Sequence, residues 1–156
     1  MKNILFIIFA LSIIGCREDF EPTPFTYSKL LTGETKKAWK LAALQYRSDE
    51  RPLITYDLPL DDCAFDDLYI FYADDTKTFE IDEGVSKCNP DDPQLFITDN
   101  WSLVNATATL EMVIPILIPF RYPYIIKELS EKRLMVEVYF IGNKESYRMI
   151  FIPIKS

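Results

Sequence analysis

The residues that most often perform catalysis are sparse in this sequence. The chain has no histidine and only four glycines among its 156 residues. A Ser-His-Asp or Cys-His arrangement needs a histidine base, and phosphate-binding loops and nucleophile elbows need closely spaced glycines. A carboxylate pair acting on a glycan needs neither, but the spacing singles out no two of the 24 acidic residues. We therefore expect a protein that is not an enzyme and that uses no cofactor.

The strongest chemical signal is a cysteine near the N-terminus. One charge, Lys2, precedes an apolar run over Ile4–Ile14, which is shorter than the roughly 20 residues that a membrane-spanning helix requires. The run ends in Ile13-Ile14-Gly15-Cys16, which resembles the bacterial lipobox, where lipid is attached to the cysteine thiol. We predict that residues 1–15 are a lipoprotein signal peptide and that acylated Cys16 anchors the chain to a membrane. The alternatives are an ordinary secretory signal and a buried apolar strand.

The residues after Cys16 suggest a location and a tether. Arg17 stands where an inner-membrane retention signal would place aspartate, and Arg17–Glu21 resembles the acidic export tag of surface lipoproteins in Bacteroidota. That resemblance implies the cell surface of the outer membrane. The alternatives are the periplasmic face and charges that only solvate a tether. Because Pro22 and Pro24 favour an extended linker, we assign residues 16–28 to the lipid-anchored tether and 29–156 to the folded domain.

The size and charge of the mature chain limit its partners. Removal of residues 1–15 from the 156-residue chain leaves 141, which suits one domain with a single core. Because Lys2 is removed as well, 16 basic and 24 acidic residues remain, and the net charge is near −8. Such a chain repels phosphate backbones, so nucleic acid is not expected as a partner.

Two cysteines remain once Cys16 is acylated. In an oxidising compartment, Cys63 and Cys88 are most simply paired in a disulfide, which stabilises the fold by roughly 3–4 kcal/mol in the chain-entropy model. That pairing would gather six carboxylates, those of Asp61, Asp62, Asp66, Asp67, Asp91 and Asp92. Calcium binds six to eight such oxygens. However, no EF-hand or Gly-Asp repeat spacing is present, and acidic loops are usually just solvated, so no metal site is predicted.

The periodicity of the domain is that of β-strands. In Leu134–Ile141, residues 134, 136, 138 and 140 are all apolar, and alternate positions face opposite sides, as in a strand with one buried face. A turn follows at Gly142–Glu145, and Tyr147–Ile154 is expected to form the antiparallel partner strand. Further strands are expected at 39–44, 68–72, 78–81, 101–103, 107–114 and 122–129, separated by turns that include Asp99-Asn100. About eight short strands argue for an all-β antiparallel barrel or sandwich. Residues Ser28–Lys37 are expected to form a short N-terminal helix capped by Ser28.

A series of short motifs resembles the lipocalin-like domain of Bacteroidota cell-surface lipoproteins. The motifs are Leu31-Thr32-Gly33, Lys37, Trp39-Lys40-Leu41, Cys63, Asp66-Asp67, Phe71, Phe79, Gly84, Cys88, Trp101, Leu110, Ile125–Leu129 and Leu134–Phe140. The resemblance implies an up-and-down barrel of eight strands, wide enough inside for side chains or one small apolar ligand. It also implies that the two cysteines pair and that Trp39 lies near the closed end. Gly33 precedes Trp39 by six residues, whereas the strict G-x-W signature has two.

Aromatic residues on the strands give two interpretations of the barrel interior. The candidates for lining a ligand cavity are Tyr69, Phe71, Phe79, Trp101, Met112, Phe140 and Phe151. The same residues would equally serve as a filled core, which is the commoner use of aromatic side chains on strands. Arg148 is expected either to stack on Trp39 and close the bottom of the barrel or to lie exposed on a polar face.

Residues 113–123 are unusual because Pro115, Pro119 and Pro123 interrupt an apolar stretch. Such prolines cannot belong to a central ladder. The stretch is either an apolar lip that meets a ligand or partner, or a bent edge strand folded over the barrel. Two functions follow for the anchored domain: holding a small hydrophobic ligand inside the barrel, or acting as a non-enzymatic interaction module or accessory subunit of an envelope or nutrient-uptake assembly.

Overall fold

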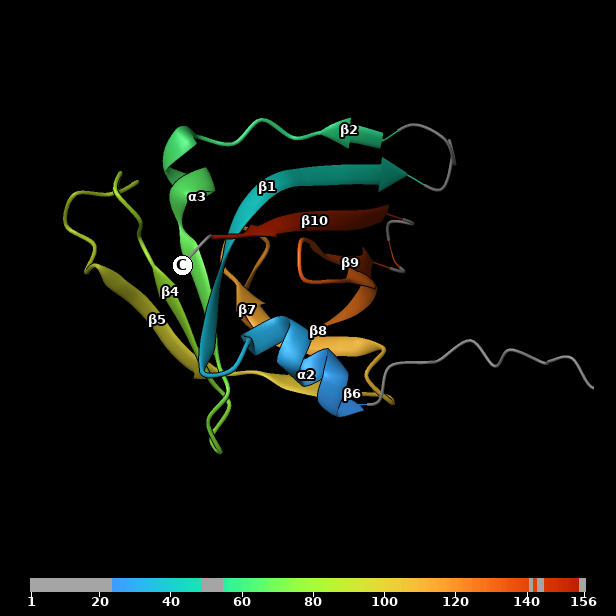
Figure 1. The fold of residues 1–156 in the computed structure, drawn as a ribbon. Coiled ribbons are helices and arrows are strands. Elements are labelled where there is room, and N and C mark those ends of the chain that lie inside the picture. The colour runs from blue at the N-terminus through green and yellow to red at the C-terminus, as the bar shows by residue number, and fades with distance from the viewer. Residues whose placement is uncertain (1–23, 49–54, 141, 143–144, 155–156) are drawn as a thin grey trace, which may run out of the picture.

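Antiparallel strands and two short helices make up the part of the chain that the computed structural model describes, residues 24–48, 55–140, 142 and 145–154 (Figure 1). The helices are α2 (Pro24–Thr32) and α3 (Asp62–Asp66). The strands are β1 (Lys36–Ser48), β2 (Thr55–Asp57), β3 (Leu68–Tyr72), β4 (Thr78–Asp82), β5 (Leu95–Asn100), β6 (Ser102–Val104), β7 (Thr109–Ile114), β8 (Ile118–Leu129), β9 (Leu134–Phe140) and β10 (Glu145–Pro153). The all-β class and the short N-terminal helix are therefore confirmed.

The strands form a nearly closed barrel. Neighbouring strands follow the order β5-β4-β3-β1-β10-β9-β8-β7-β6, and β2 pairs with β1 outside this path. The first and last strands of the order, β5 and β6, are consecutive in the chain and are joined by Trp101. We call the side where they meet the seam. The barrel has nine strands along this path, one more than expected, because Leu95–Asn100 forms a strand where a turn at Asp99-Asn100 was expected.

Helix α2 differs from the expected segment at both ends. It begins at Pro24, within the stretch assigned to the tether, because proline suits the first position of a helix, where no N–H partner is needed. It ends at Thr32, and the next residue, Gly33, closes the helix C-terminus through its φ of +66° and an N–H bond to the carbonyl of Lys29 (2.8 Å). Ser28 is thus an interior residue, and its carbonyl accepts the hydroxyl of Thr32 (3.0 Å).

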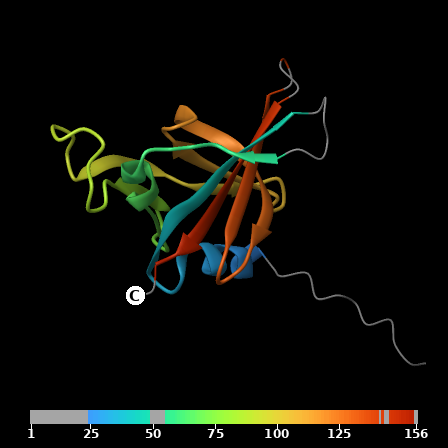
Figure 2. The same cartoon turned by 90° about the horizontal axis from the view of Figure 1, so that it is seen from above.

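The two helices mark the two ends of β3. Helix α2 leads through Gly33 into the start of β1, where Lys36 is paired with Tyr72, the last residue of β3. Helix α3 precedes the first residue of β3, Leu68, which is paired with Asp82. We call these the α2 end and the α3 end of the barrel. Seen from above, the helices also lie apart from one another (Figure 2).

The proline-rich stretch forms the β7–β8 hairpin and the first half of β8, which is paired with a neighbouring strand on one side only. Pro115 opens the turn between β7 and β8, and Pro119 and Pro123 lie within β8. Residues 118–124 pair with β7, and the pairing of β8 with β9 begins at Ile125. The prolines are tolerated because their side of this half-strand needs no ladder hydrogen bond. Of the two interpretations of this stretch, the edge strand matches the first half of β8, which pairs with β7 alone.

Candidate functional site

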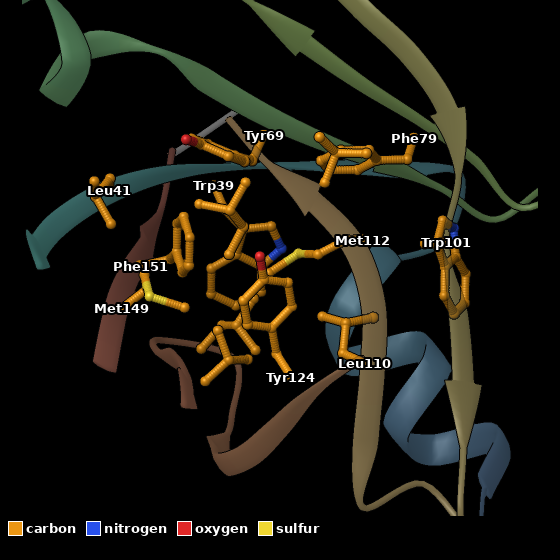
Figure 3. Close-up of a cluster of buried hydrophobic side chains, with 14 of the residues drawn as sticks. Trp39, Leu41, Tyr69, Phe79, Trp101, Leu110, Met112, Tyr124, Met149 and Phe151 are labelled. Carbon is orange, nitrogen blue, oxygen red and sulfur yellow. The ribbon is translucent and has the colours of Figure 1, made fainter. Parts of the chain in front are cut away.

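The residues proposed to line a ligand cavity come together in the barrel interior. Six of them, Tyr69, Phe71, Phe79, Trp101, Met112 and Phe151, are at most 3% exposed. Ring centroids are 5.0 Å apart for Tyr69 and Phe151 and 4.9 Å apart for Phe71 and Phe79. Side chains from several strands point toward one another in this core (Figure 3). Phe140 is only partly buried and packs on Tyr147. These contacts support the interpretation as a filled core.

Trp39 closes the α2 end, but its cationic partner is not Arg148. The indole Nε1 of Trp39 donates to the carbonyl of Leu31 (2.8 Å), and the Lys37 ammonium lies over the Trp39 ring. The expected stacking of Arg148 on Trp39 is wrong. In the register of β1 and β10, Arg148 is paired with Gln45, six residues from Trp39, and its guanidinium binds Glu137 (2.8 Å).

Four carboxylates gather at the α3 end. Asp66 and Asp67 precede β3, Asp82 is the last residue of β4, and Glu83 follows it. The register pairs Leu68 with Asp82 and Tyr69 with Ile81, and its continuation by one residue sets Asp67 opposite Glu83. Asp67 shares the inward parity of Tyr69, and Glu83 shares that of Ile81, since alternate residues face one side of a strand. Glu83 is 4% exposed.

The predicted disulfide holds the loop that bears these acids. Cys63 of α3 is bonded to Cys88, with 5.2 Å between the Cα atoms, so the predicted pairing is confirmed. The Oδ2 atom of Asp66 accepts the backbone N–H groups of Val85 and Ser86, both at 2.8 Å. The backbone N–H of Cys88 donates to Glu83 (3.4 Å). The loop after β4 is thus fixed to α3 by one covalent bond and by backbone donors.

Asp67 lacks such support. Its Oδ1 atom is buried and has no hydrogen-bond partner among the described residues. Burial raises the pKa of Asp67, and the negative charges of Glu83, Asp66 and Asp82 raise it further, to about 7. The carboxyl group of Asp67 is therefore far easier to protonate than an exposed aspartate.

Two further buried side-chain atoms lack a hydrogen-bond partner among the described residues, Oδ1 of Asp66 and the phenol oxygen of Tyr124. Tyr124 is 0% exposed. Burial raises the pKa of Tyr69, and the charges of Asp67 and Tyr124 raise it further. The charges of both groups therefore act on Tyr69, and the Tyr124 oxygen points into the core in Figure 3.

A ladder of aromatic rings leads from this buried group to the surface. The ring centroids of Tyr124 and Tyr122 are 6.0 Å apart, and those of Tyr122 and Phe120 are 6.4 Å apart. Exposure rises along β8 from the buried Tyr124 to Phe120, which is 61% exposed. Beside this ladder, Arg121 forms an ion pair with Asp99 of β5. That pair bridges the seam, and its hydrogen bond holds the pKa of Asp99 below the usual range.

Sequence reasoning found only part of this site. Asp66 and Asp67 were noted as members of an acidic neighbourhood, whereas Glu83, Tyr124 and Tyr122 were missed. The alternation Phe79, Ile81, Glu83 is a signal that could have placed Glu83 on the inner face. Among the described residues, no three aspartate, glutamate, histidine or cysteine side chains converge closely enough to hold a metal ion.

The α2 end has a groove of about 820 Å³ between α2, the start of β1 and the end of β10. Three lysines line it, and two of them already have partners. Lys29 forms an ion pair with Glu34 (2.6 Å), and Lys37 donates to the carbonyls of Leu30 and Glu131. The groove therefore presents less positive charge than its composition suggests, and we assign it no ligand.

Comparison with protein-family models and with curated proteins finds no match for this chain. None of the described helices has the length and apolar character needed to cross a membrane.

Proposed function

We propose that this chain is a lipid-anchored envelope protein whose barrel binds a small ligand at the α3 end of its interior without catalysing a reaction. The observation that carries this proposal is a pair of buried side-chain oxygens without a hydrogen-bond partner in the described chain, the hydroxyl of Tyr124 and Oδ1 of Asp67. The aromatic side chains, for which a cavity lining and a filled core were both considered, pack against one another, so the ligand occupies the rim of that core and not its centre.

The energetic cost of the unpaired groups supports a ligand. A buried polar group without a hydrogen bond costs roughly 1–3 kcal/mol, and native proteins keep few of them. Asp66, Asp67 and Tyr124 each present one such atom. A ligand that donates to the carboxylate and bonds to the hydroxyl recovers this cost, whereas a phenylalanine in place of Tyr124 would have avoided part of it.

The membrane anchor is proposed from the sequence. Only residues 17–23 separate Cys16 from Pro24, the first residue of α2. Eight steps of at most about 3.6 Å limit the Cys16–Pro24 separation to about 30 Å. An acylated Cys16 therefore places the α2 end toward the lipid and leaves the α3 end free to meet a ligand. The acidic run after Cys16 supports the outer face of the outer membrane as the location.

The test uses the full chain purified from the membranes of a Bacteroidota host in mild detergent. We expect native mass spectrometry to detect a diacyl or triacyl modification, which is lost in Cys16→Ser. We also expect a small bound molecule that is released by organic extraction and is absent from Tyr124→Phe, with Tyr147→Phe as a control outside the site. A chain without acyl groups overturns the anchor, and ligand occupancy unchanged by Tyr124→Phe overturns the site.

A protein partner at the β7–β8 hairpin is the second candidate function. The exposed apolar side chains Ile116 and Phe120 lie on this hairpin, at 36% and 61% exposure. Exposed apolar side chains that cluster often mark a protein contact. Cross-linking in intact cells from a photoreactive residue in place of Phe120 tests this candidate, because a subunit of an envelope assembly would give a discrete adduct there.

A further inference from the structure

The carboxylates of the α3 end lack a counter-charge. Among the described residues, none of Asp66, Asp67, Asp82 and Glu83 takes part in an ion pair, although five ion pairs occur elsewhere in the same part of the chain. Their described hydrogen-bond donors are neutral. The amide of Gln94 and the N–H of Gly84 serve Asp82 (2.7 and 3.0 Å), and backbone N–H groups serve Asp66 and Glu83.

Such an arrangement is costly without a cation. Carboxylates opposite one another on neighbouring strands repel, and burial weakens the screening that water provides. Glu83 is almost fully buried, and Asp67 and Glu83 each lie one residue beyond the Leu68–Asp82 pair that ends the β3–β4 ladder. A positive charge placed between them would remove the repulsion and would pair with the free Oδ1 of Asp67.

We propose that the ligand of this barrel carries an organic cationic head, an amine, which binds between the inward-facing carboxylates of Asp67 and Glu83 with the Tyr124 hydroxyl as a further polar contact. This inference rests on the proposed function, because it names the chemical class of the ligand bound at that same site. An amine fits better than a metal ion, since the described side chains form no metal cage, whereas an ammonium group needs only two or three oxygens and tolerates aromatic neighbours.

The body of the ligand is apolar and slender. The aromatic ladder of Tyr124, Tyr122 and Phe120 reaches solvent at Phe120, and its rings offer apolar faces and edges along β8. The seam beside them is bridged by the Arg121–Asp99 ion pair and has no described ladder between β5 and β6. An alkyl or aryl tail can lie along this ladder while the head reaches the acids.

The experiment compares three probes of equal chain length, n-decylamine, n-decanol and decanoate, below their aggregation limits. Isothermal titration calorimetry is run on the full chain after removal of bound molecules. We expect decylamine to bind at least about tenfold more tightly than decanol, and decanoate to bind most weakly. Asp67→Asn and Glu83→Gln should each weaken decylamine binding about tenfold and leave decanol binding unchanged. Asp91→Asn, an exposed acid of the same loop region, should change neither.

The outcomes separate the two proposals. Equal affinities for decylamine and decanol, or an amine preference that survives both Asp67→Asn and Glu83→Gln, overturn the cationic head and leave the ligand-binding barrel standing. If none of the three probes binds and the protein from its host also lacks an extractable molecule, the proposed function fails together with this inference. Thermal unfolding of each variant confirms that it is folded before titration.

Discussion

The side-chain ammonium of Lys37 lies 4.1 Å from the centre of the Trp39 ring, directly inside the α2 end of the barrel. The same nitrogen donates to the carbonyls of Leu30 (3.0 Å) and Glu131 (3.1 Å), so it joins helix α2, strand β1 and the turn between β8 and β9. Burial lowers the pKa of Lys37, and the charge of Glu131 offsets part of that effect. One lysine therefore closes this end of the barrel.

Replacement of Lys37 by methionine should destabilise the domain by about 1–2 kcal/mol, because a cation-π contact and two hydrogen bonds are lost while the apolar stem is kept. Urea unfolding followed by tryptophan fluorescence measures the change. Lys36→Met is the matched control. Lys36 is exposed, and its ammonium lies 5.3 Å from the Tyr72 ring, so a loss of less than about 0.5 kcal/mol is expected. Equal losses in the two variants would contradict the role given to Lys37.

The partner of Trp39 shows where sequence reasoning stops. Alternating hydrophobicity predicted β3 with its observed bounds and located β9 and β10, because each buries one face of a strand. Which cation reaches Trp39 depends on the register between β1 and β10, which places Pro153 and not Arg148 beside it. Register follows from the whole barrel, and a single strand pattern does not contain it.

The candidate site was predictable only in part for the same reason. Asp67 and Glu83 are 16 positions apart in the chain and become neighbours only through the β3–β4 pairing. Strand β5 was missed because it lacks the alternation of buried and exposed residues that marks a strand. Leu95 and Phe96 are both exposed, and none of the six residues is fully buried. The disulfide was predictable because the assignment of Cys16 to lipid attachment left two cysteines and therefore a single pairing.

Glu137 should stabilise the outer face of the barrel through two arginines. Its carboxylate binds Arg148 at 2.8 Å and Arg47 at 3.3 Å. Burial would raise the pKa of Glu137, but the hydrogen bond and charges of the arginines more than offset this and hold it below the usual range. Glu137→Gln is therefore expected to cost about 1–2 kcal/mol at pH 7.

The pH dependence of that loss follows from the lowered pKa. The stabilisation by Glu137 is present above the unfolded-state pKa of about 4.3 and is lost as the pH falls below it through the folded-state value. The difference between wild type and Glu137→Gln should thus shrink below about pH 4. Glu128→Gln is the control, since the Glu128–Arg133 pair is largely exposed and longer (3.5 Å). A constant difference from pH 3 to pH 7 would show that charge is not the cause.

Gly84 should tolerate no side chain. Its φ is +69°, and an added methyl group would meet the carbonyl oxygen of Asp66 at 2.3 Å and its carbonyl carbon at 2.7 Å. Both partners are backbone atoms held by the disulfide-linked loop, so neither can move aside. Gly84→Ala should destabilise by about 3 kcal/mol or more. Gly142→Ala, whose new methyl would meet nothing within 4 Å, is expected to change the stability by less than about 0.5 kcal/mol in the same urea titration.

Asp67 should make the ligand-free domain less stable as the pH rises. Its folded-state pKa of about 7 lies above the unfolded value of about 3.9. The favourable contribution of its neutral form is complete below about pH 4 and is lost as the pH increases through about 7. Because an asparagine side chain cannot ionise, Asp67→Asn should be more stable than wild type by about 1–2 kcal/mol at pH 8, a value reduced for solvent screening, and equal to it near pH 4.

Chemical unfolding at pH 4, 6 and 8, on protein freed of bound molecules, checks this last prediction. Asp91→Asn removes an exposed carboxylate near the disulfide and should leave the stability unchanged at all three values. If Asp67→Asn is less stable than wild type at pH 8, the ionised carboxylate has a favourable partner within the folded chain. In that case the carboxylate of Asp67 stabilises the fold and has no need of a ligand. If it is more stable, the domain keeps in Asp67 a charge that weakens its own fold, which is the behaviour expected of the ligand-binding carboxylate that we propose.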